Sequence, residues 1–475
     1  MLWRLLRGHW PFLVVVAAGA AFRVLAMIGY SPGFWFFGDS TIYVNGAYTH
    51  VPNPSRPYGY SFVLSVLSPL HSVRLIIGLQ HLLGLAVAIL MYAFLRRRDL
   101  ARWLATIAVA PILLDARTVL LEHFLIAESL FIALLVGAVI ALCWSERPGW
   151  WAAAGGGTLL AAAALTRTIA LPLVVVVALY LLVRRAGLLR VGAFAMAFAI
   201  PLAGYAVWYE HHHGTYSLGT FTGRFMWART MSFVDCAKVH NLTARERQIC
   251  PPEPLGERRA VDLYIWSRAS PAAKFQKREH DAMFASFARK AIMAQPLDYA
   301  RTVAVETWFM VRVGPDPDDR YSCFDQLWSF PTAGLTNCQP IMAPEDIATR
   351  REGVNGSEHR TALTGPLHTY SQVGTLPATF TALCLLLAIA APLVRRWRRV
   401  AQDRRDVIDG LFLTGVAFGM IVISVATSVM EPRYTVPSIP LAAMGAALAL
   451  RRGHRARAPE PTLTPAAAPA EQIAA

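Results

Sequence analysis

Charged residues are scarce in this chain: only 16% of its 475 residues are Asp, Glu, Lys or Arg, whereas 55% are hydrophobic. An average soluble domain carries about 25% charged residues. Together with a mean hydropathy of +0.41, this deficit argues against a soluble globular protein and predicts a polytopic membrane protein. The sequence also lacks a Walker-type phosphate loop and the glycine pattern of dinucleotide-binding folds, so it does not indicate that cytosolic nucleotides supply energy.

Acidic residues are outnumbered by basic ones, and the formal net charge is +15. The arginines occur in short clusters between apolar runs and not along one stripe. This is the pattern of cytoplasmic membrane loops, where Lys and Arg are retained, and it differs from the basic face that nucleic-acid binding requires. We therefore expect membrane lipids as partners and no nucleic acid.

Long apolar runs divide the chain into membrane spans, each of which needs about 20 residues to cross a bilayer core as a helix. The run at 151–183 is too long for one span and holds Arg167 at its middle, so we divide it at 166–168. This division keeps the arginine cluster that begins at Arg184 in the cytoplasm, as the positive-inside tendency requires. The sequence then predicts ten spans with both termini cytoplasmic: about 11–30, 75–95, 101–114, 121–144, the two halves of 151–183, 190–209, 373–394, 407–429 and a last span after 437.

The expected fold class is an all-α integral membrane protein with about ten transmembrane helices and a mostly helical extracytoplasmic domain. The spans define four parts of the chain. These are a transmembrane module at 1–209 whose first outer loop holds Asp39, an extracytoplasmic domain at 210–367, C-terminal transmembrane helices at 368–452 and a disordered cytoplasmic tail at 453–475.

The expected extracytoplasmic domain carries helix signals of its own. Thr243 and Glu246 have the spacing of a capping box. A proline opens each of two further expected helices, at Pro271 and at Pro296. These signals predict a folded domain and not a flexible loop.

Cysteine is rare, with six residues. Two of them lie in apolar spans, where a thiol is an ordinary small hydrophobe. The other four fall in the expected extracytoplasmic domain, where three pairings are open. Disulfides would place this segment outside the cytosol, whereas the alternative is four free thiols. The pairings that we expect are the local ones, Cys236 with Cys250 and Cys323 with Cys338.

Ionisable residues gather at the outer ends of the predicted spans. Such residues are costly in a membrane and are usually retained for function, although interfacial snorkelling and structural ion pairs are the alternative. Glu128 and Arg167 stand out because each has several apolar neighbours on both sides. The whole set is Asp39, Asp115, Arg117, Glu122, Glu128, Arg167, Glu431 and Arg433.

Four stretches mark this outer side: FWFFGDSTIY at 34–43, LLEHFLIAESLF at 120–131, ALTRTIALP at 164–172 and EPRYTVPSIP at 431–440. In this order and at these places relative to the spans, they resemble the GT-C glycosyltransferases, and the resemblance covers about residues 10–450. The members of this superfamily are polytopic enzymes that take a sugar from a polyprenyl-phosphate carrier. They include protein mannosyltransferases and bacterial aminoarabinose and lipid-sugar transferases.

The resemblance implies inverting transfer of a sugar from a polyprenyl-phosphate donor to an extracytoplasmic hydroxyl of a cell-envelope lipid, glycan or protein. It also implies the plasma membrane of a bacterial-type cell. Asp39 would be the general base that removes the acceptor proton, a role worth about 10²–10⁴-fold in rate. Arg167 and Arg433, with Tyr434 as a further donor, would hold the phosphate that leaves. The supporting polar cluster would be Asp115, Arg117, Glu122 and Glu128.

The residues do not favour a metal. Many GT-C enzymes have two adjacent acids in the first outer loop, whereas here Asp39 is followed by Ser40. The three histidines at 211–213 cannot all face one ion from a helix end, and Glu122 and Glu128 lie on different helix faces. We therefore predict no metal site, and no cofactor is indicated.

A polytopic transporter or lipid flippase is the main alternative, because ten spans with intramembrane charges suit one as well. Transporters often contain inverted repeats with broken helices at the midplane. No such symmetry relates the two halves of this sequence, and its charges collect at one face. A polymerase or ligase of surface glycans would share the lipid-phosphate chemistry but usually has a different order of spans.

Overall fold

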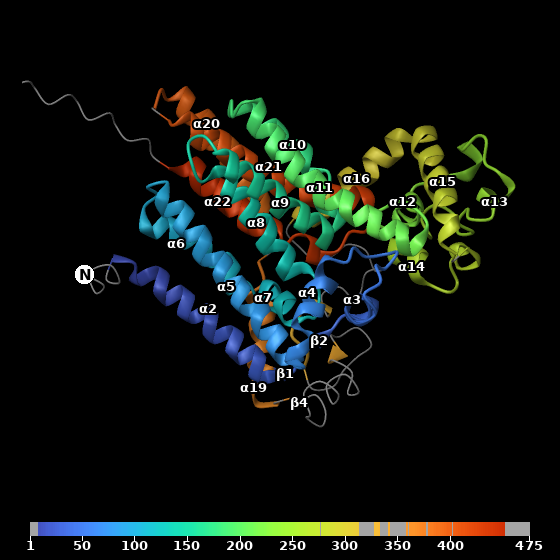
Figure 1. Cartoon of the computed structure of the whole chain (residues 1–475), viewed down its shortest axis with the longest axis horizontal. Helices are drawn as coiled ribbons and strands as arrows, with labels where there is room; N and C mark the ends of the chain where they lie inside the picture. The colour runs from blue at the N-terminus through green and yellow to red at the C-terminus, as the bar shows by residue number, and fades with distance from the viewer. Residues whose placement is uncertain are drawn as a thin grey trace, which may run out of the picture.

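The computed structural model describes residues 8–275, 277–312, 327–332, 341–342, 358–359, 361–376, 379–400 and 402–451. Most of these residues lie in helices (Figure 1), which confirms the all-α class for the described part of the chain. Two antiparallel pairs of two-residue strands tie distant segments together. β1 (Tyr30–Ser31) pairs with β4 (Glu358–His359), and β2 (Phe34–Trp35) pairs with β3 (Ile341–Met342). The predicted tail at 453–475 lies outside the described residues.

The main body is a bundle whose helices are joined at two ends (Figure 1). We call the end that holds most of the short helices the loop end, and the opposite end, where α5, α8, α10 and α20 finish, the arginine end. The bundle helices are α2 (Trp10–Gly29), α5 (Val73–Arg97), α6 (Arg102–Leu114), α8 (Glu128–Cys143), α9 (Trp150–Thr166), α10 (Leu173–Val183), α11 (Leu188–His213), α20 (Thr379–Trp397), α21 (Arg404–Thr427) and α22 (Ser438–Leu450). The short helices are α3 (Phe37–Thr49), α4 (Gly59–Leu67), α7 (Ala116–His123) and α19 (Thr361–Val373), with the 3-10 turns η1 (Ser68–Leu70), η2 (Thr168–Ala170) and η7 (Pro432–Tyr434).

Each of the ten predicted spans overlaps one of the bundle helices, but the spans at 121–144 and 373–394 begin in the short helices α7 and α19. Among the described residues, five helices are long and apolar enough to cross a membrane, namely α2, α5, α11, α20 and α21. The pair α6 and α7, bent by 47°, would make a sixth. The others are shorter: α22 has 13 residues and extends about 20 Å, less than a bilayer core of about 30 Å. By length and composition, at least five of the described helices could therefore span a membrane, and the number ten stays a prediction.

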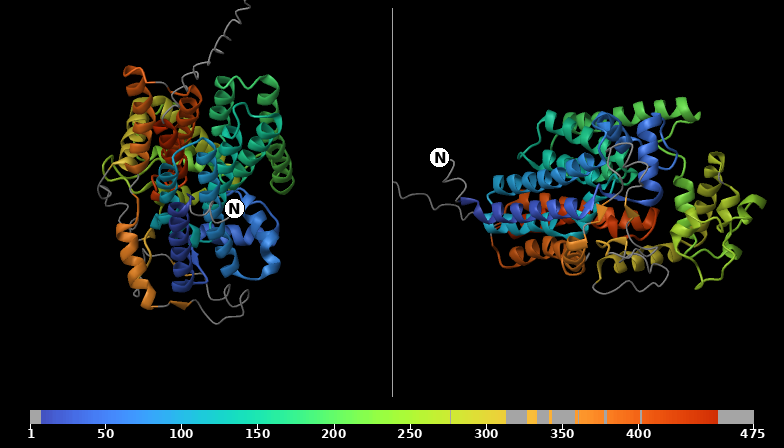
Figure 2. Two further views of the ribbon diagram at one scale, coloured as in Figure 1. Left: turned by 90° about the vertical axis from the view of Figure 1, so that its left-hand side faces the viewer. Right: turned by 90° about the horizontal axis from the view of Figure 1, so that it is seen from below.

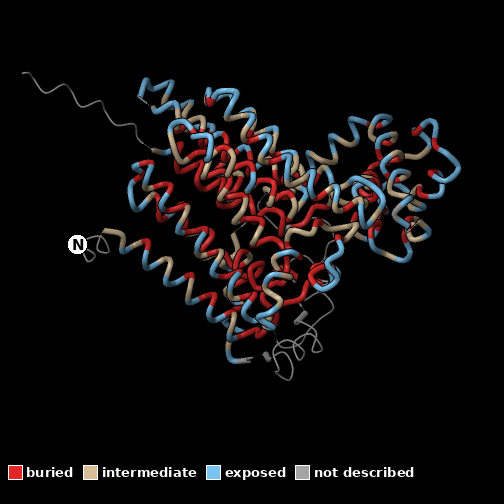
Figure 3. Tube along the Cα trace, in the orientation of Figure 1, coloured by how far each residue is buried: buried red, intermediate tan, exposed pale blue. Residues whose placement is uncertain are grey.

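Helix α22 forms the centre of the bundle. All its residues from Ser438 to Ala449 are buried (Figure 3), as expected for a helix that is apolar on every side. Small residues let α21 approach it closely, because a Cβ atom on Gly445 would lie 2.5 Å from Thr414 Cγ2 and 2.8 Å from the Gly410 carbonyl oxygen. This close packing fixes η7, the turn directly before α22, within the core of the loop end.

A helical lobe lies beyond the loop end (Figures 1 and 2). Its apolar core includes Trp227, Ile249, Tyr264 and Phe287 and continues to Val429 and Tyr434 in the segment between α21 and α22. After the lobe, α16 (Pro296–Val311) returns to the bundle and packs against α20 and α21. The lobe consists of α12 (Thr222–Thr230), α13 (Ala244–Arg247), α14 (Val261–Trp266) and α15 (Asp281–Ala294), with η3 (Cys236–Lys238), η4 (Pro271–Lys274) and η5 (Arg278–His280).

Local sequence signals in the lobe gave mixed results. The Cys236–Cys250 disulfide is present, whereas Cys323 and Cys338 lie outside the described residues. The capping box at Thr243 is formed, and Pro296 opens α16. Pro271 opens only a 3-10 turn capped by Ser270, and the α-helix begins later, at Asp281. The Asp281 carboxylate accepts hydrogen bonds from the backbone amides of Gly223 and Arg224, so the start of α15 is fixed by its contact with α12.

The buried carboxylate of Glu246 provides a stability test for the lobe. Burial favours its protonated form, but hydrogen bonds from Lys290 Nζ (2.8 Å) and from the Thr243 backbone amide (2.7 Å) outweigh burial and lower its pKa to about 2. A depressed pKa adds stability above pH 4.5 that is lost as the pH falls towards 2.

We therefore expect Glu246→Gln to lower the free energy of unfolding by about 1–3 kcal/mol at pH 7, with a difference from wild type that shrinks below pH 4. Chemical denaturation of the purified protein at several pH values measures this. The exposed Glu279→Gln serves as the control. An equal effect of Glu246→Gln at pH 7 and pH 3 would contradict the role of the charge.

Candidate active site

Asp39 lies at the loop end, in the first turn of α3. Its turn is anchored by Ser40, whose buried hydroxyl accepts a hydrogen bond from the Phe36 amide (2.8 Å) and donates one to the Leu125 carbonyl (2.9 Å). Ser40, which directly follows Asp39, thus has a structural role. The Asp39 carboxylate accepts a hydrogen bond from Arg56 Nη2 at 2.8 Å and lies 3.2 Å from Arg433 Nη1. Its side chain is 13% exposed.

Arg433 is at the centre of the site. It belongs to η7, and its Nε donates to Glu431 Oε2 at 2.7 Å. Its Nη1 lies 3.2 Å from Asp39 and 3.4 Å from Glu128 Oε1. The guanidinium carbon lies 4.5 Å from the ring centroid of Phe36 and 5.9 Å from that of Trp328. Arg433 therefore has acids around its edge and aromatic rings against its faces.

Glu128 and Arg167 continue the cluster. Glu128 is the first residue of α8, and Arg167 caps the end of α9 at the break before η2. Arg167 Nη1 donates to Glu128 Oε1, and its guanidinium lies 5.0 Å from the ring of Tyr434. The break between α9 and η2, where the sequence predicted a division into two short helices, thus allows the Arg167 side chain to contact Glu128 and Tyr434.

The resulting site is a chain of alternating acids and arginines. Three carboxylates and three guanidinium groups balance in formal charge, and all six are contributed by loops or helix ends of the loop end. In order of contact, the chain runs Arg56, Asp39, Arg433, Glu128, Arg167, with Glu431 attached to Arg433.

The arginines set the protonation of Asp39. Burial alone would raise the pKa of this carboxyl, but Arg56 and Arg433 outweigh burial and hold the pKa below its ordinary value. Asp39 is therefore ionised at neutral pH. Glu431 responds in the opposite direction, because burial raises the pKa of its carboxyl despite the adjacent Arg433.

The structure brings together six of the residues singled out in the sequence: Asp39, Glu128, Arg167, Glu431, Arg433 and Tyr434. The other members of the predicted supporting cluster lie elsewhere. Asp115 caps α7 and accepts hydrogen bonds from Thr118 and from the Leu376 amide, and Arg117 is half-buried in the first turn of that helix.

Glu122 belongs to a separate network inside the bundle. Its two oxygens each accept a hydrogen bond of 2.7 Å from Arg23, and one also lies 2.9 Å from His81 Nδ1. His81 contacts His123, which contacts the Tyr30 carbonyl. This network connects α2, α5 and α7, and Glu122 takes no part in the contacts of Asp39 that the described residues make.

Arg56 and the two aromatic rings of the lobe that contact it, Phe225 and Trp266, were not predicted. Arg56 lies in the proline-rich segment before α4, and its guanidinium lies 5.6 Å from the ring of Phe225 and 5.9 Å from that of Trp266. Both rings come from the lobe, so Arg56 links the lobe to Asp39. The sequence did contain a signal for Arg56, because no other Lys or Arg occurs between residues 31 and 72, the segment that contains Asp39.

Within the described residues, no group of three or more His, Cys, Asp or Glu side chains is arranged to hold a metal ion. His213 of the triple-histidine stretch lies 2.6 Å from the Pro52 carbonyl through Nε2. Its contact therefore joins the end of α11 to the segment between α3 and α4.

An apolar groove adjoins the charged cluster. It has a volume of about 550 Å³ and lies between α4, α8, α9 and α11. Leu130 and Thr166 line it, and these residues follow Glu128 and precede Arg167 in the chain. Other lining side chains include Phe62, Leu134, Tyr205 and Trp208.

No protein-family model and no curated protein matches this chain. Among solved structures, it is similar to the S. cerevisiae protein O-mannosyltransferase Pmt1-Pmt2 complex bound to the sugar donor. The similarity has 17% identity and a TM-score of 0.34, and it covers 46% of this chain and 36% of that chain. It spans little more than a third of the yeast chain, and a likeness of this size does not establish the family.

Proposed function

We propose that this protein is a membrane glycosyltransferase that moves a sugar from a polyprenyl-phosphate donor to an acceptor hydroxyl, with Asp39 as the general base. The observation that carries the proposal is the contact of the ionised Asp39 with Arg56 and Arg433 at the loop end. A base and several phosphate-binding groups lie within one cluster, as glycosyl transfer from a lipid phosphate requires.

In this mechanism the acceptor hydroxyl attacks the anomeric carbon of the donor. Its proton passes to the Asp39 carboxylate, and the bond between the anomeric carbon and the phosphate oxygen breaks with its electron pair going to the phosphate. The charge on the phosphate grows as that bond breaks. Arginine groups that are already in place favour this change, because preorganised donors lose little energy in reorientation. One base is sufficient for such a displacement, which inverts the configuration of the sugar.

The charge balance of the site suggests that Arg433 and Arg167 exchange their carboxylate partners for the donor phosphate when the donor binds. Arg433 and Arg167 are paired with carboxylates here, so a donor phosphate competes with Asp39 and Glu128 for them. When the phosphate takes Arg433, Asp39 loses one of the charges that lower its pKa. Asp39 then becomes a stronger base when the donor is bound.

The apolar groove supports the lipid part of the donor. A polyprenyl chain is wholly hydrocarbon, so a groove lined by apolar side chains can hold it without burying an unpaired polar group. The groove is lined by Thr166, which directly precedes Arg167 in the chain. In this proposal the prenyl chain lies in the groove while the phosphate of the same donor lies at the arginines.

The direct test is to reconstitute the full chain in vesicles with radiolabelled polyprenyl-phosphate sugars and a cell-envelope extract as acceptor. We expect a glycosylated product that requires the protein, and a rate of product formation about 10²–10⁴-fold lower with Asp39→Asn. Movement of the labelled lipid between leaflets without any product would contradict the proposal and support a flippase.

A further inference from the structure

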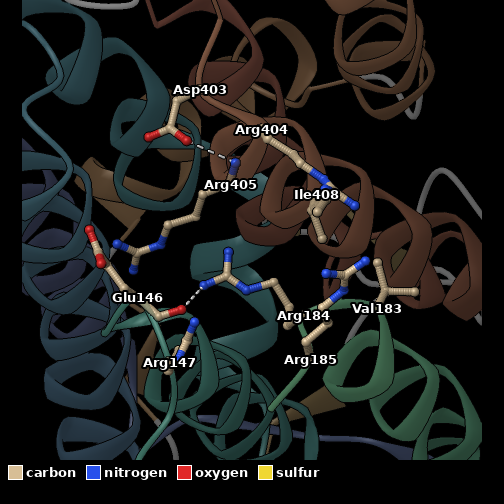
Figure 4. Close-up of a pocket in the computed structure, with 9 residues that line it drawn as sticks. All are labelled: Glu146, Arg147, Val183, Arg184, Arg185, Asp403, Arg404, Arg405 and Ile408. Atoms are coloured by element: carbon tan, nitrogen blue, oxygen red, sulfur yellow. Dashed lines mark hydrogen bonds between the residues drawn. The ribbon is translucent and has the colours of Figure 1, made fainter.

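A second charged pocket lies at the arginine end, outside the site described above. It has a volume of about 360 Å³ and is formed by the loop after α8, the end of α10 and the start of α21 (Figure 4). Its lining contains five arginines and two carboxylates, which leaves a formal charge of +3. The charged lining residues are Glu146, Arg147, Arg184, Arg185, Asp403, Arg404 and Arg405.

The inner wall of this pocket is held in place by buried contacts. Asp409 is fully buried and accepts a hydrogen bond of 3.0 Å from Arg184 Nη1 and one of 2.5 Å from Arg98 Nη1. Arg405 Nη2 donates to the Cys143 carbonyl at 2.9 Å, and Arg184 Nη2 donates to the Glu146 carbonyl. Two of the arginines therefore have fixed positions before any ligand binds, which lowers the entropy that binding costs.

The positive charge of the pocket is only partly neutralised. One carboxylate, Asp409, is shared by Arg98, Arg184 and Arg405, and Arg405 Nε is buried without a hydrogen bond in the described part of the chain. Arg147, Arg185 and Arg404 make no ion pair with any described residue and are exposed. Arginines that serve only to keep a loop in the cytoplasm need only to face water. The arginines here surround a cavity instead.

We propose that this pocket binds the phosphate group of an anionic ligand, either the headgroup of an anionic lipid or a free phosphate compound. Arginine guanidinium groups bind phosphate oxygens through paired, charge-assisted hydrogen bonds. Val183 and Ile408 also line the pocket, and the exposed Leu188 and Leu189 lie in the helix that follows. An apolar chain attached to the phosphate would have apolar surface beside it. The site is independent of the proposed glycosyl transfer, because it lies at the opposite end of the bundle.

The test uses the full-length protein in detergent, titrated with three probes: short-chain phosphatidylglycerol, short-chain phosphatidylcholine and inorganic pyrophosphate. Binding is measured by the rise in the thermal unfolding midpoint. The pocket variant is Arg147→Gln/Arg404→Gln, and the matched control is Arg396→Gln/Arg398→Gln, which removes the same charge from exposed arginines outside the pocket. All four side chains are exposed, so we expect both variants to fold like the wild type.

We expect wild type and control to bind an anionic probe with the same affinity within about twofold. The pocket variant should bind at least about tenfold more weakly, since each charge-assisted hydrogen bond is worth about this much. Response to phosphatidylglycerol but not to pyrophosphate identifies a lipid headgroup, and the reverse identifies a free phosphate compound. Equal weakening in both variants, a pocket variant that binds like wild type, equally strong binding of phosphatidylcholine, or no response of the wild type to either anion would overturn the proposal.

Discussion

Replacement of Asp39 by asparagine is expected to reduce sugar transfer by about 10²–10⁴-fold while the protein remains folded. The amide has nearly the same shape as the carboxylate but cannot accept a proton from the acceptor hydroxyl. Asp39 lies near one end of the charge chain, between Arg56 and Arg433, and its side chain keeps some exposure to solvent. The arginines that lose their partner, Arg56 and Arg433, retain aromatic contacts, and Arg433 also retains Glu431 and Glu128. The initial rate of product formation in vesicles measures the loss.

A matched control for this variant is Asp298→Asn, the same substitution at an exposed position in the first turn of α16. It should transfer sugar at the wild-type rate. The pH dependence adds a second measurement, because arginines lower the pKa of Asp39 before the donor binds. The acidic limb of kcat should lie at a higher pH than that of kcat/KM if the donor phosphate takes Arg433 from Asp39. Asp39→Asn protein with at least half of the wild-type rate would remove Asp39 from the mechanism.

Arg433 should give the second large effect, on donor binding and on stability together. It contacts Asp39, Glu128 and Glu431, so its removal leaves three acids near one another with only Arg56 and Arg167 to neutralise them. Breaking a buried ion pair costs about 3–5 kcal/mol of stability. We therefore expect Arg433→Ala to unfold at a clearly lower temperature and to bind the donor weakly.

Arg433→Lys separates the two effects. Lysine keeps the positive charge but lacks the planar fork that holds a phosphate through two hydrogen bonds. We expect a donor KM at least about tenfold above wild type, with most of the stability retained. The control is Arg229→Lys, because Arg229 makes a buried bidentate pair with Glu306 away from the site, at 2.6 Å for each bond. It should lose stability without any change in KM. An unchanged donor KM in folded Arg433→Lys would exclude Arg433 from phosphate binding.

Much of the candidate site could be predicted because membrane spans reduce the problem to two ends. Asp39 and Arg433 are 394 residues apart, yet each borders a span at the same end, so the sequence placed both at one face. The same reasoning grouped Glu122 and Asp115 with them, but in the structure these two residues make other contacts. Being at the same end does not define which helix face a side chain occupies. Glu122 faces Arg23 in the bundle interior, and Asp115 is used to cap α7.

The missed residues depend on loop conformation, which periodicity does not describe. Arg56 reaches Asp39 only because the proline-rich segment before α4 folds back over α3 and under the lobe. At the arginine end, the clusters were visible in the sequence, but no pattern separates the buried Arg98 from its exposed neighbour Arg97. That difference arises from Asp406 and Asp409, which are more than 300 residues away.

The guanidinium of Arg56 is held between the catalytic candidate on one side and two rings of the outer lobe on the other. A displacement of α12 or α14 would therefore change the electrostatic surroundings of Asp39 without touching it. If the proposed acceptor docks on the lobe, its contact with α12 or α14 would therefore act through Arg56 on the proton affinity of Asp39.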